Sequence, residues 1–157
     1  MTATDRESID LFTRTTTVIC FAILMAVPIY AVVAYLAVGQ NANTAVPELA
    51  PVVVWVLAAI AVAQLLVASV VAGKLKTAAA SKSTAEERLA SYRVSIIVGF
   101  AIRESTAIIG LVITFLSGDL GWCVGLGALS IASMLLAWPK RSEAEALAAD
   151  PATAPIG

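Results

Sequence analysis

Four long apolar stretches limit what this 157-residue sequence can fold into. They lie at about residues 17–38, 52–72, 94–116 and 122–138, and a helix needs roughly 20 mostly apolar residues to cross a bilayer. Only 13% of the residues are charged, against about 25% in soluble domains. The sequence therefore predicts an all-α, polytopic membrane protein, a single domain with four transmembrane helices.

Basic residues divide the segments outside these stretches into two kinds. Nine of the ten Lys and Arg residues lie in the leader (1–16), in or directly after the second connection (74–92), and in the tail (140–157). Because Lys and Arg concentrate on the cytoplasmic side, we expect both termini and this connection to be cytoplasmic, in a protein of the inner (plasma) membrane. The leader is expected to form a short interfacial helix or a frayed end, and the tail to be flexible.

Two local patterns predict helix starts and helix contacts. In the second connection, Ser83 or Thr84 precedes two glutamates, which is typical of a capped helix N-terminus. Small residues recur at intervals that bring them to one helix face, where they allow close packing in membranes. They are Ala58, Ala61, Ala68 and Ala72 in the second stretch, and Gly121 and Gly125 in the fourth.

Little in the sequence could support catalysis by this chain alone. It has no histidine, and Cys20 and Cys123 stand alone in different stretches, without the spacing of a metal site. Their positions near opposite membrane faces also argue against a disulfide. No Gly-rich phosphate loop or Ser/His/Asp set is present. We expect a non-enzymatic protein without a nucleic-acid partner, surrounded by membrane lipids.

A carboxylate lies in the middle of the third stretch, at Glu104, directly after Arg103. Ionisable side chains inside a membrane are costly and usually mark a functional site. Counted from Arg93, Glu104 is about 15 Å into the membrane, and Gln64 is equally far from Lys74, at about 1.5 Å per residue. We therefore expect Glu104 and Gln64 to be level with each other across an antiparallel hairpin.

The residues from Glu104 onward resemble the ion-binding helix of rotary ATPase c subunits, the proteolipids of the rotor ring. Glutamate is followed by Ser105, Thr106 and an aliphatic run, and in sodium-type c subunits an inner helix supplies a glutamine, as Gln64 would here. The resemblance covers about residues 52–116. It implies a homo-oligomeric ring in which Glu104, Gln64, Ser105 and Thr106 bind a sodium ion or a proton. Carboxylate, amide and hydroxyl oxygens suit such an ion.

Arg103 leaves a second interpretation open, because the c-subunit pattern has no arginine there. A guanidinium next to Glu104 would favour the charged form of the carboxylate. The two residues would then form a structural ion pair, within one chain or between chains. The chain would be a non-catalytic accessory subunit of a larger membrane complex.

Overall fold

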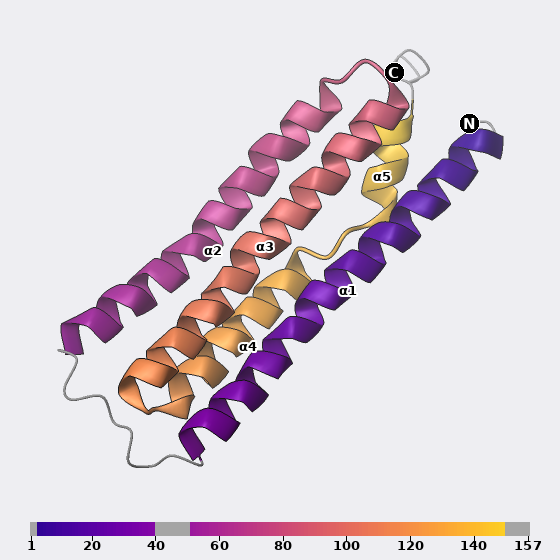
Figure 1. Ribbon diagram of the computed structural model, residues 1–157. Coiled ribbons are helices and arrows are strands. Elements are labelled where there is room, and N and C mark those ends of the chain that lie inside the picture. Colours follow the sequence, from indigo (N-terminus) through magenta and orange to yellow (C-terminus); the bar gives the residue numbers. More distant parts are fainter. Residues whose placement is uncertain (1–2, 40–50, 150–157) are drawn as a thin grey trace.

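The computed structural model describes residues 3–39 and 51–149, and within these ranges the chain forms five helices and no strand (Figure 1). The helices are α1 (Ala3–Gly39), α2 (Pro51–Ala80), α3 (Ala85–Ser117), α4 (Leu120–Leu136) and α5 (Arg141–Ala148). Helices α1, α2 and α3 are each long and apolar enough to cross a membrane, and α4 with α5 provides a fourth candidate if the bent pair is one span. The all-α class is confirmed, and the structure contains three or four candidate membrane-spanning helices.

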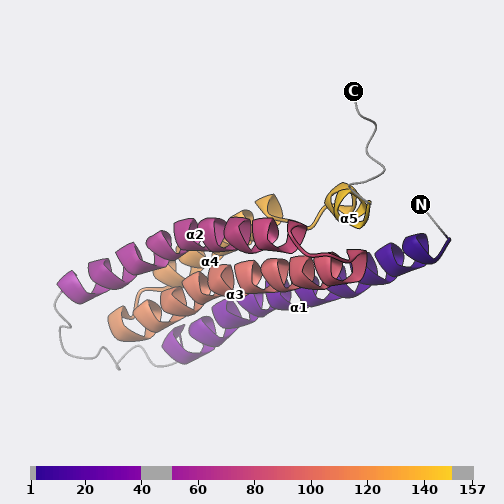
Figure 2. The same cartoon turned by 90° about the horizontal axis from the view of Figure 1, so that it is seen from above.

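Helix α3 occupies the centre of the bundle. It packs along α2, α4 and α1, and it lies between α2 and α1 (Figure 2). The most extensive contact is the α2–α3 hairpin. Ala58 and Ala61 of α2 are buried there beside Ile113 of α3, as the stripe of small residues predicts.

The polar leader is part of the first long helix. Helix α1 begins at Ala3 and continues through Pro28 to Gly39. Phe12 is buried and stacks on Tyr92 of α3, with 5.7 Å between the ring centroids. This contact gives the leader an apolar partner, so the leader continues α1 instead of forming a separate interfacial helix.

The connection predicted at residues 74–92 is mostly helical. Only residues 81–84 lie outside α2 and α3. The predicted cap is confirmed, because the Thr84 hydroxyl accepts a hydrogen bond from the Glu87 backbone N–H at 3.2 Å. A short, capped turn of this kind fixes how residues of α2 and α3 face each other.

The prediction of a flexible tail from residue 140 is wrong as far as Ala149. Helix α5 packs on α3 and α1, buries Ala144, and places Leu147 and Ala148 against the core. These three residues form an apolar stripe at helical spacing, which is the physical reason why the segment folds onto the bundle. Residues 150–157 lie outside the described part.

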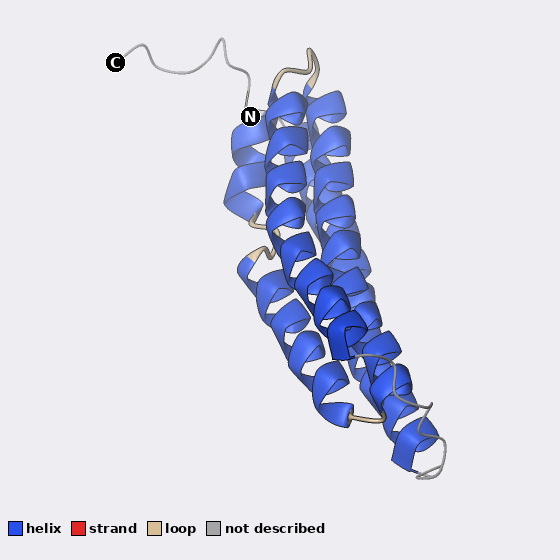
Figure 3. Ribbon diagram, turned by 90° about the vertical axis from the view of Figure 1, so that its left-hand side faces the viewer, coloured by secondary structure: helices blue, strands red, loops and turns tan. Residues whose placement is uncertain are grey.

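Two breaks set the length of α4. Gly118, with a φ of 73°, ends α3 in the left-handed conformation that glycine adopts without strain. Asp119 then caps α4 by accepting a hydrogen bond from the Gly121 N–H at 2.8 Å. At its other end α4 stops at Leu136, and a non-helical link leads to α5 with a bend of 44° (Figure 3).

The ends of the helices place the basic residues together. The start of α1, the α2–α3 turn and α5 all lie at one end of the bundle (Figure 1). That end carries Lys74, Lys76, Arg88, Lys140 and Arg141, whereas the α3–α4 turn lies at the opposite end. The fold therefore gathers these charges at one end, which the positive-inside rule predicts to be cytoplasmic.

Cysteine labelling tests this orientation. We predict that Ser81→Cys, in the α2–α3 turn, reacts with a membrane-impermeant maleimide only after the cell membrane is opened. Ser117→Cys, at the end of α3, should react in intact cells. The parent chain is the control, because Cys20 and Cys123 are both buried. Labelling of both variants from the same side would overturn the topology.

Candidate functional site

Arg103 and Glu104 project from α3 toward different helices. The Glu104 carboxylate accepts a hydrogen bond from the phenol of Tyr30 on α1, at 2.5 Å. The Arg103 guanidinium instead donates to Ser69 Oγ on α2, at 3.3 Å, and to the Gly99 carbonyl on its own helix, at 2.9 Å. The two side chains therefore serve two different helix contacts.

The structure does not bring Arg103 and Glu104 together as an ion pair within one chain. Among the described residues, ion pairs join Lys76 to Glu143 and Arg141 to Asp10 and Glu145. Consecutive residues of a helix point about 100° apart and do not face each other. A pair between Arg103 of one chain and Glu104 of another stays a prediction.

The polar residues that follow Glu104 face α2. The Ser105 hydroxyl donates to Gln64 Oε1 at 2.8 Å, so the expected level placement across the hairpin is confirmed. Thr106, fully buried, donates to the Ala61 carbonyl at 3.1 Å. Three of the four predicted ion ligands thus lie on the α2 side, while the Glu104 carboxylate bonds to α1.

This division limits what Glu104 can bind within one chain. A metal cation is held by several oxygen ligands at once, whereas among the described residues the Glu104 carboxylate has the Tyr30 phenol as its hydrogen-bond partner. No cluster of three or more His, Cys, Asp or Glu side chains that could hold a metal occurs in the described ranges. A carboxyl paired with a hydroxyl suits a proton better.

Sequence reasoning did not find Tyr30. Tyr30 lies inside the first apolar stretch, and a buried tyrosine hydroxyl usually has a hydrogen-bond partner. The sequence could therefore have indicated that Tyr30 bonds to a polar group of another helix. The sequence does not say which face of α1 meets α3. The partner of Glu104 therefore became visible only in the folded bundle.

A second polar cluster ties α5 to the other helices at the basic end. Glu143 pairs with Lys76 of α2 at 2.8 Å and accepts a hydrogen bond from the Tyr92 hydroxyl of α3 at 2.6 Å. The Lys76 ammonium and the Tyr92 hydroxyl hold the pKa of the Glu143 carboxyl below its usual range. The contact therefore stabilises docked α5 at neutral pH, and this contribution is lost as the pH falls through the lowered pKa.

Arg88 holds the far end of α5. Its side chain is 8% exposed and donates to the carbonyls of Leu147 at 2.7 Å and Ala149 at 3.4 Å. Carbonyls at a helix C-terminus lack partners within the helix, so a cation that bonds to them stabilises the helix end. This cluster has a structural role, and the sequence did not single it out.

No protein-family model, curated protein or solved structure matches this chain. A function therefore has to be argued from the chemistry of the side chains that the fold brings together.

Proposed function

We propose that this chain is a non-enzymatic membrane protein that binds and releases a proton at Glu104, as a subunit of a homo-oligomer or of a larger membrane assembly. One observation carries the proposal. A carboxyl group near the middle of a membrane-spanning helix has a tyrosine hydroxyl, rather than a cation, as its hydrogen-bond partner.

The cost of an unpaired charge supports reversible protonation. An ionised carboxylate in a membrane interior costs several kcal/mol unless it is paired, and protonation removes that charge. The Tyr30 hydroxyl can donate to the ionised carboxylate, and its oxygen can accept from the protonated form. Tyr30 and Glu104 can therefore hydrogen-bond to each other whether the carboxyl is ionised or protonated, which suits a site that gains and loses a proton.

The resemblance to c subunits favours a ring as the form of the homo-oligomer, with the α2–α3 hairpin as its repeating unit. In each chain, however, α1 lies beside Glu104 through Tyr30. A carboxyl bound by another helix of its own chain is less open to a stationary partner than the site of a rotor. We therefore propose a static assembly, in which Glu104 gains and loses its proton without rotation.

Carbodiimide labelling tests the proton site, because the reagent attacks protonated carboxyls in apolar surroundings. We predict that Glu104 is labelled in membranes and that labelling falls as the pH rises. Tyr30→Phe removes a donor to the ionised form. Its labelling should rise by about fivefold at a pH where the wild-type carboxyl is mostly ionised, since a hydrogen bond to a charged group contributes about 1 kcal/mol more than one to a neutral group. Peptide mass spectrometry locates and quantifies the adduct.

Matched variants make the experiment specific. Tyr35→Phe changes a tyrosine of the same helix that is 64% exposed, and it should label like the wild type. Glu104→Gln should remove the adduct. If sodium protected Glu104 from labelling, the site would bind a metal ion instead of a proton. Gln64 and Ser105 would then again be candidate ligands of that ion. Absence of labelling at every pH where the fold survives would contradict the proton site and favour a purely structural accessory subunit.

A further inference from the structure

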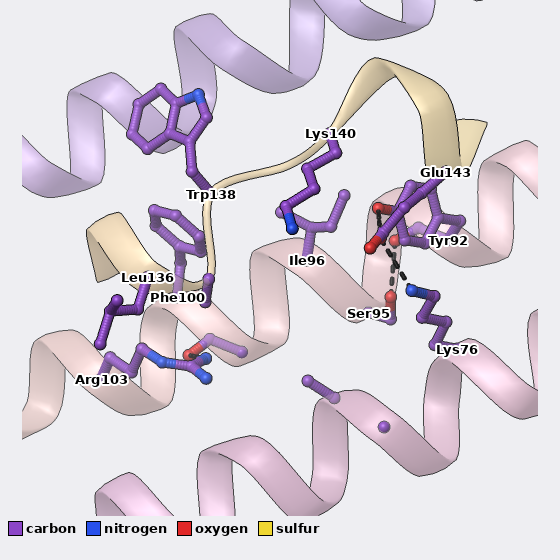
Figure 4. Close-up of a pocket in the computed structure, with 14 residues that line it drawn as sticks. Lys76, Tyr92, Ser95, Ile96, Phe100, Arg103, Leu136, Trp138, Lys140 and Glu143 are labelled. Atoms are coloured by element: carbon purple, nitrogen blue, oxygen red, sulfur yellow. Dashed lines mark hydrogen bonds and ion pairs between the residues drawn. The ribbon is translucent and has the colours of Figure 1, made fainter. Parts of the chain in front are cut away.

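A cavity of about 200 Å³ lies between α2, α3 and the link that joins α4 to α5 (Figure 4). It exists because α4 ends at Leu136 and the chain bends before α5 begins, so neither α4 nor α5 covers this part of α3. Small residues on the facing helices, Ala72, Gly73 and Gly99, widen the space.

The cavity carries an excess of positive charge. Lys76, Arg103 and Lys140 line it together with a single acid, Glu143. Three positive charges and one negative charge leave a net charge of +2. The carboxylate is already bound by Lys76 at 2.8 Å and by the Tyr92 hydroxyl at 2.6 Å. Among the described residues, no ion pair joins this carboxylate to Arg103 or Lys140.

Arg103 lies at the deep end of the cavity and is only 6% exposed. Its guanidinium folds back along α3 toward the basic end (Figure 4). This conformation depends on Gly99, because a Cβ there would lie 3.0 Å from Arg103 Nη1 and 3.2 Å from the Ala72 Cβ. Its two hydrogen bonds, to the Gly99 carbonyl and to Ser69 Oγ, use two of five N–H donors. The guanidinium thus retains donors for a ligand in the cavity.

We propose that this cavity binds a phosphate-type anion, which Arg103 holds at the deep end and Lys140 holds at the mouth. A buried arginine without an anionic partner is strongly unfavourable, and within the described residues no carboxylate pairs with it. The planar donors of a guanidinium match phosphate oxygens in pairs. Basic pockets between transmembrane helices on the cytoplasmic side are typical sites for anionic lipid headgroups.

The dimensions of the cavity fit this ligand. Its volume of about 200 Å³ equals that of roughly seven water molecules at about 30 Å³ each. This is enough for a phosphate group but not for a whole lipid. Leu136, which lines the cavity, is 87% exposed, so the mouth has an apolar edge along which acyl chains can lie outside. A lipid headgroup and a free phosphate share the chemistry that the cavity recognises.

Isothermal titration of the full chain in a neutral detergent tests the proposal. The ligands are short-chain phosphatidylglycerol, inorganic phosphate, and an uncharged diglyceride with the same acyl chains. We expect saturable binding of an anion and none of the diglyceride. Arg103→Gln and Lys140→Gln should each weaken binding by about tenfold or more, because each loses a charge-assisted hydrogen bond. Lys82→Gln is the matched control, since Lys82 is an exposed lysine at the same end that does not line the cavity.

The possible outcomes either distinguish a lipid headgroup from a soluble phosphate as the ligand, or show that the cavity does not bind an anion. Binding of the lipid but not of inorganic phosphate assigns a headgroup, and binding of inorganic phosphate with equal or greater affinity assigns a soluble anion. Lys140 is exposed, so its variant remains informative if Arg103→Gln does not fold. The proposal is overturned if neither anion binds, or if Lys140→Gln binds as tightly as Lys82→Gln.

Discussion

Gly110→Val is expected to lower the free energy of unfolding by about 3 kcal/mol, the upper part of the range for overpacked sites. A Cβ at this position would lie 3.0 Å from the Leu126 Cβ and 3.0 Å from the Trp122 backbone oxygen of α4. A backbone oxygen cannot move aside like a flexible side chain, so α3 and α4 would have to separate. Denaturation of the purified protein in mixed detergent micelles measures the loss.

Gly125→Val is the matched control for this prediction. Gly125 lies on α4, and a Cβ there meets nothing within 4 Å. Substitutions at such surface positions usually change stability by less than about 0.5 kcal/mol. Equal destabilisation by the two variants would contradict the close approach of α3 and α4 at Gly110.

Arg88→Ala is expected to release α5 from the bundle. The arginine donates to the carbonyls of Leu147, Ala149 and Lys82 at 2.7, 3.4 and 3.3 Å, and it is almost fully buried. Loss of these charge-assisted hydrogen bonds should cost about 2 kcal/mol of local stability. Amide hydrogen exchange in α5 should accelerate by roughly 30-fold, since about 1.4 kcal/mol corresponds to a factor of ten. Exchange in the middle of α3 should not change.

The control for Arg88 is Arg141→Ala. Arg141 pairs with Asp10 at 2.8 Å and with Glu145 at 2.9 Å, but its side chain is exposed. Water and salt screen exposed ion pairs, which therefore contribute little to stability, so exchange in α5 should accelerate only several-fold. If Arg141→Ala released α5 as fully as Arg88→Ala, the helix would be held by charge at its start rather than by hydrogen bonds at its end.

The membrane-spanning helices could be predicted from the sequence because their cause is local. An apolar stretch of sufficient length forms a helix wherever its partners lie. The helix ends were predicted less well, because they depend on contacts between distant residues. The leader is helical because Phe12 stacks on Tyr92. The first part of the tail packs on the bundle because Ala144 is buried in the core.

The same distinction explains which site contacts were predictable. A four-residue turn joins α2 and α3, so counting residues from the turn places Gln64 level with Ser105. No such count relates α1 to α3, and the Tyr30–Glu104 contact could not be derived. The direction in which the Arg103 side chain points was also not predictable, because it depends on the space that a glycine leaves at position 99.

The Gly121 and Gly125 pair shows how a packing pattern can mislead. The atoms nearest to a Cβ at Gly121 would be those of the Asp119 side chain in the adjoining turn, and a Cβ at Gly125 would have nothing within 4 Å. Within one chain, α4 instead makes close helix contacts opposite Gly110 of α3 and, through Gly127, with Val27 of α1. Spacing identifies which residues share a face, but it does not identify the face that a neighbouring helix covers.

The shortness of α4 affects the surrounding lipid. Its 17 residues span about 26 Å, whereas the 30 residues of α2 span about 45 Å at 1.5 Å per residue. A hydrocarbon layer about 30 Å thick is therefore crossed fully by α2 but not by α4. In such a bilayer we expect the lipids beside α4 to shorten or tilt to match it, which would thin the bilayer on that face of the protein. Two copies that met through their α4 faces would share one thinned region instead of making two, and we expect the elasticity of the membrane to favour that contact.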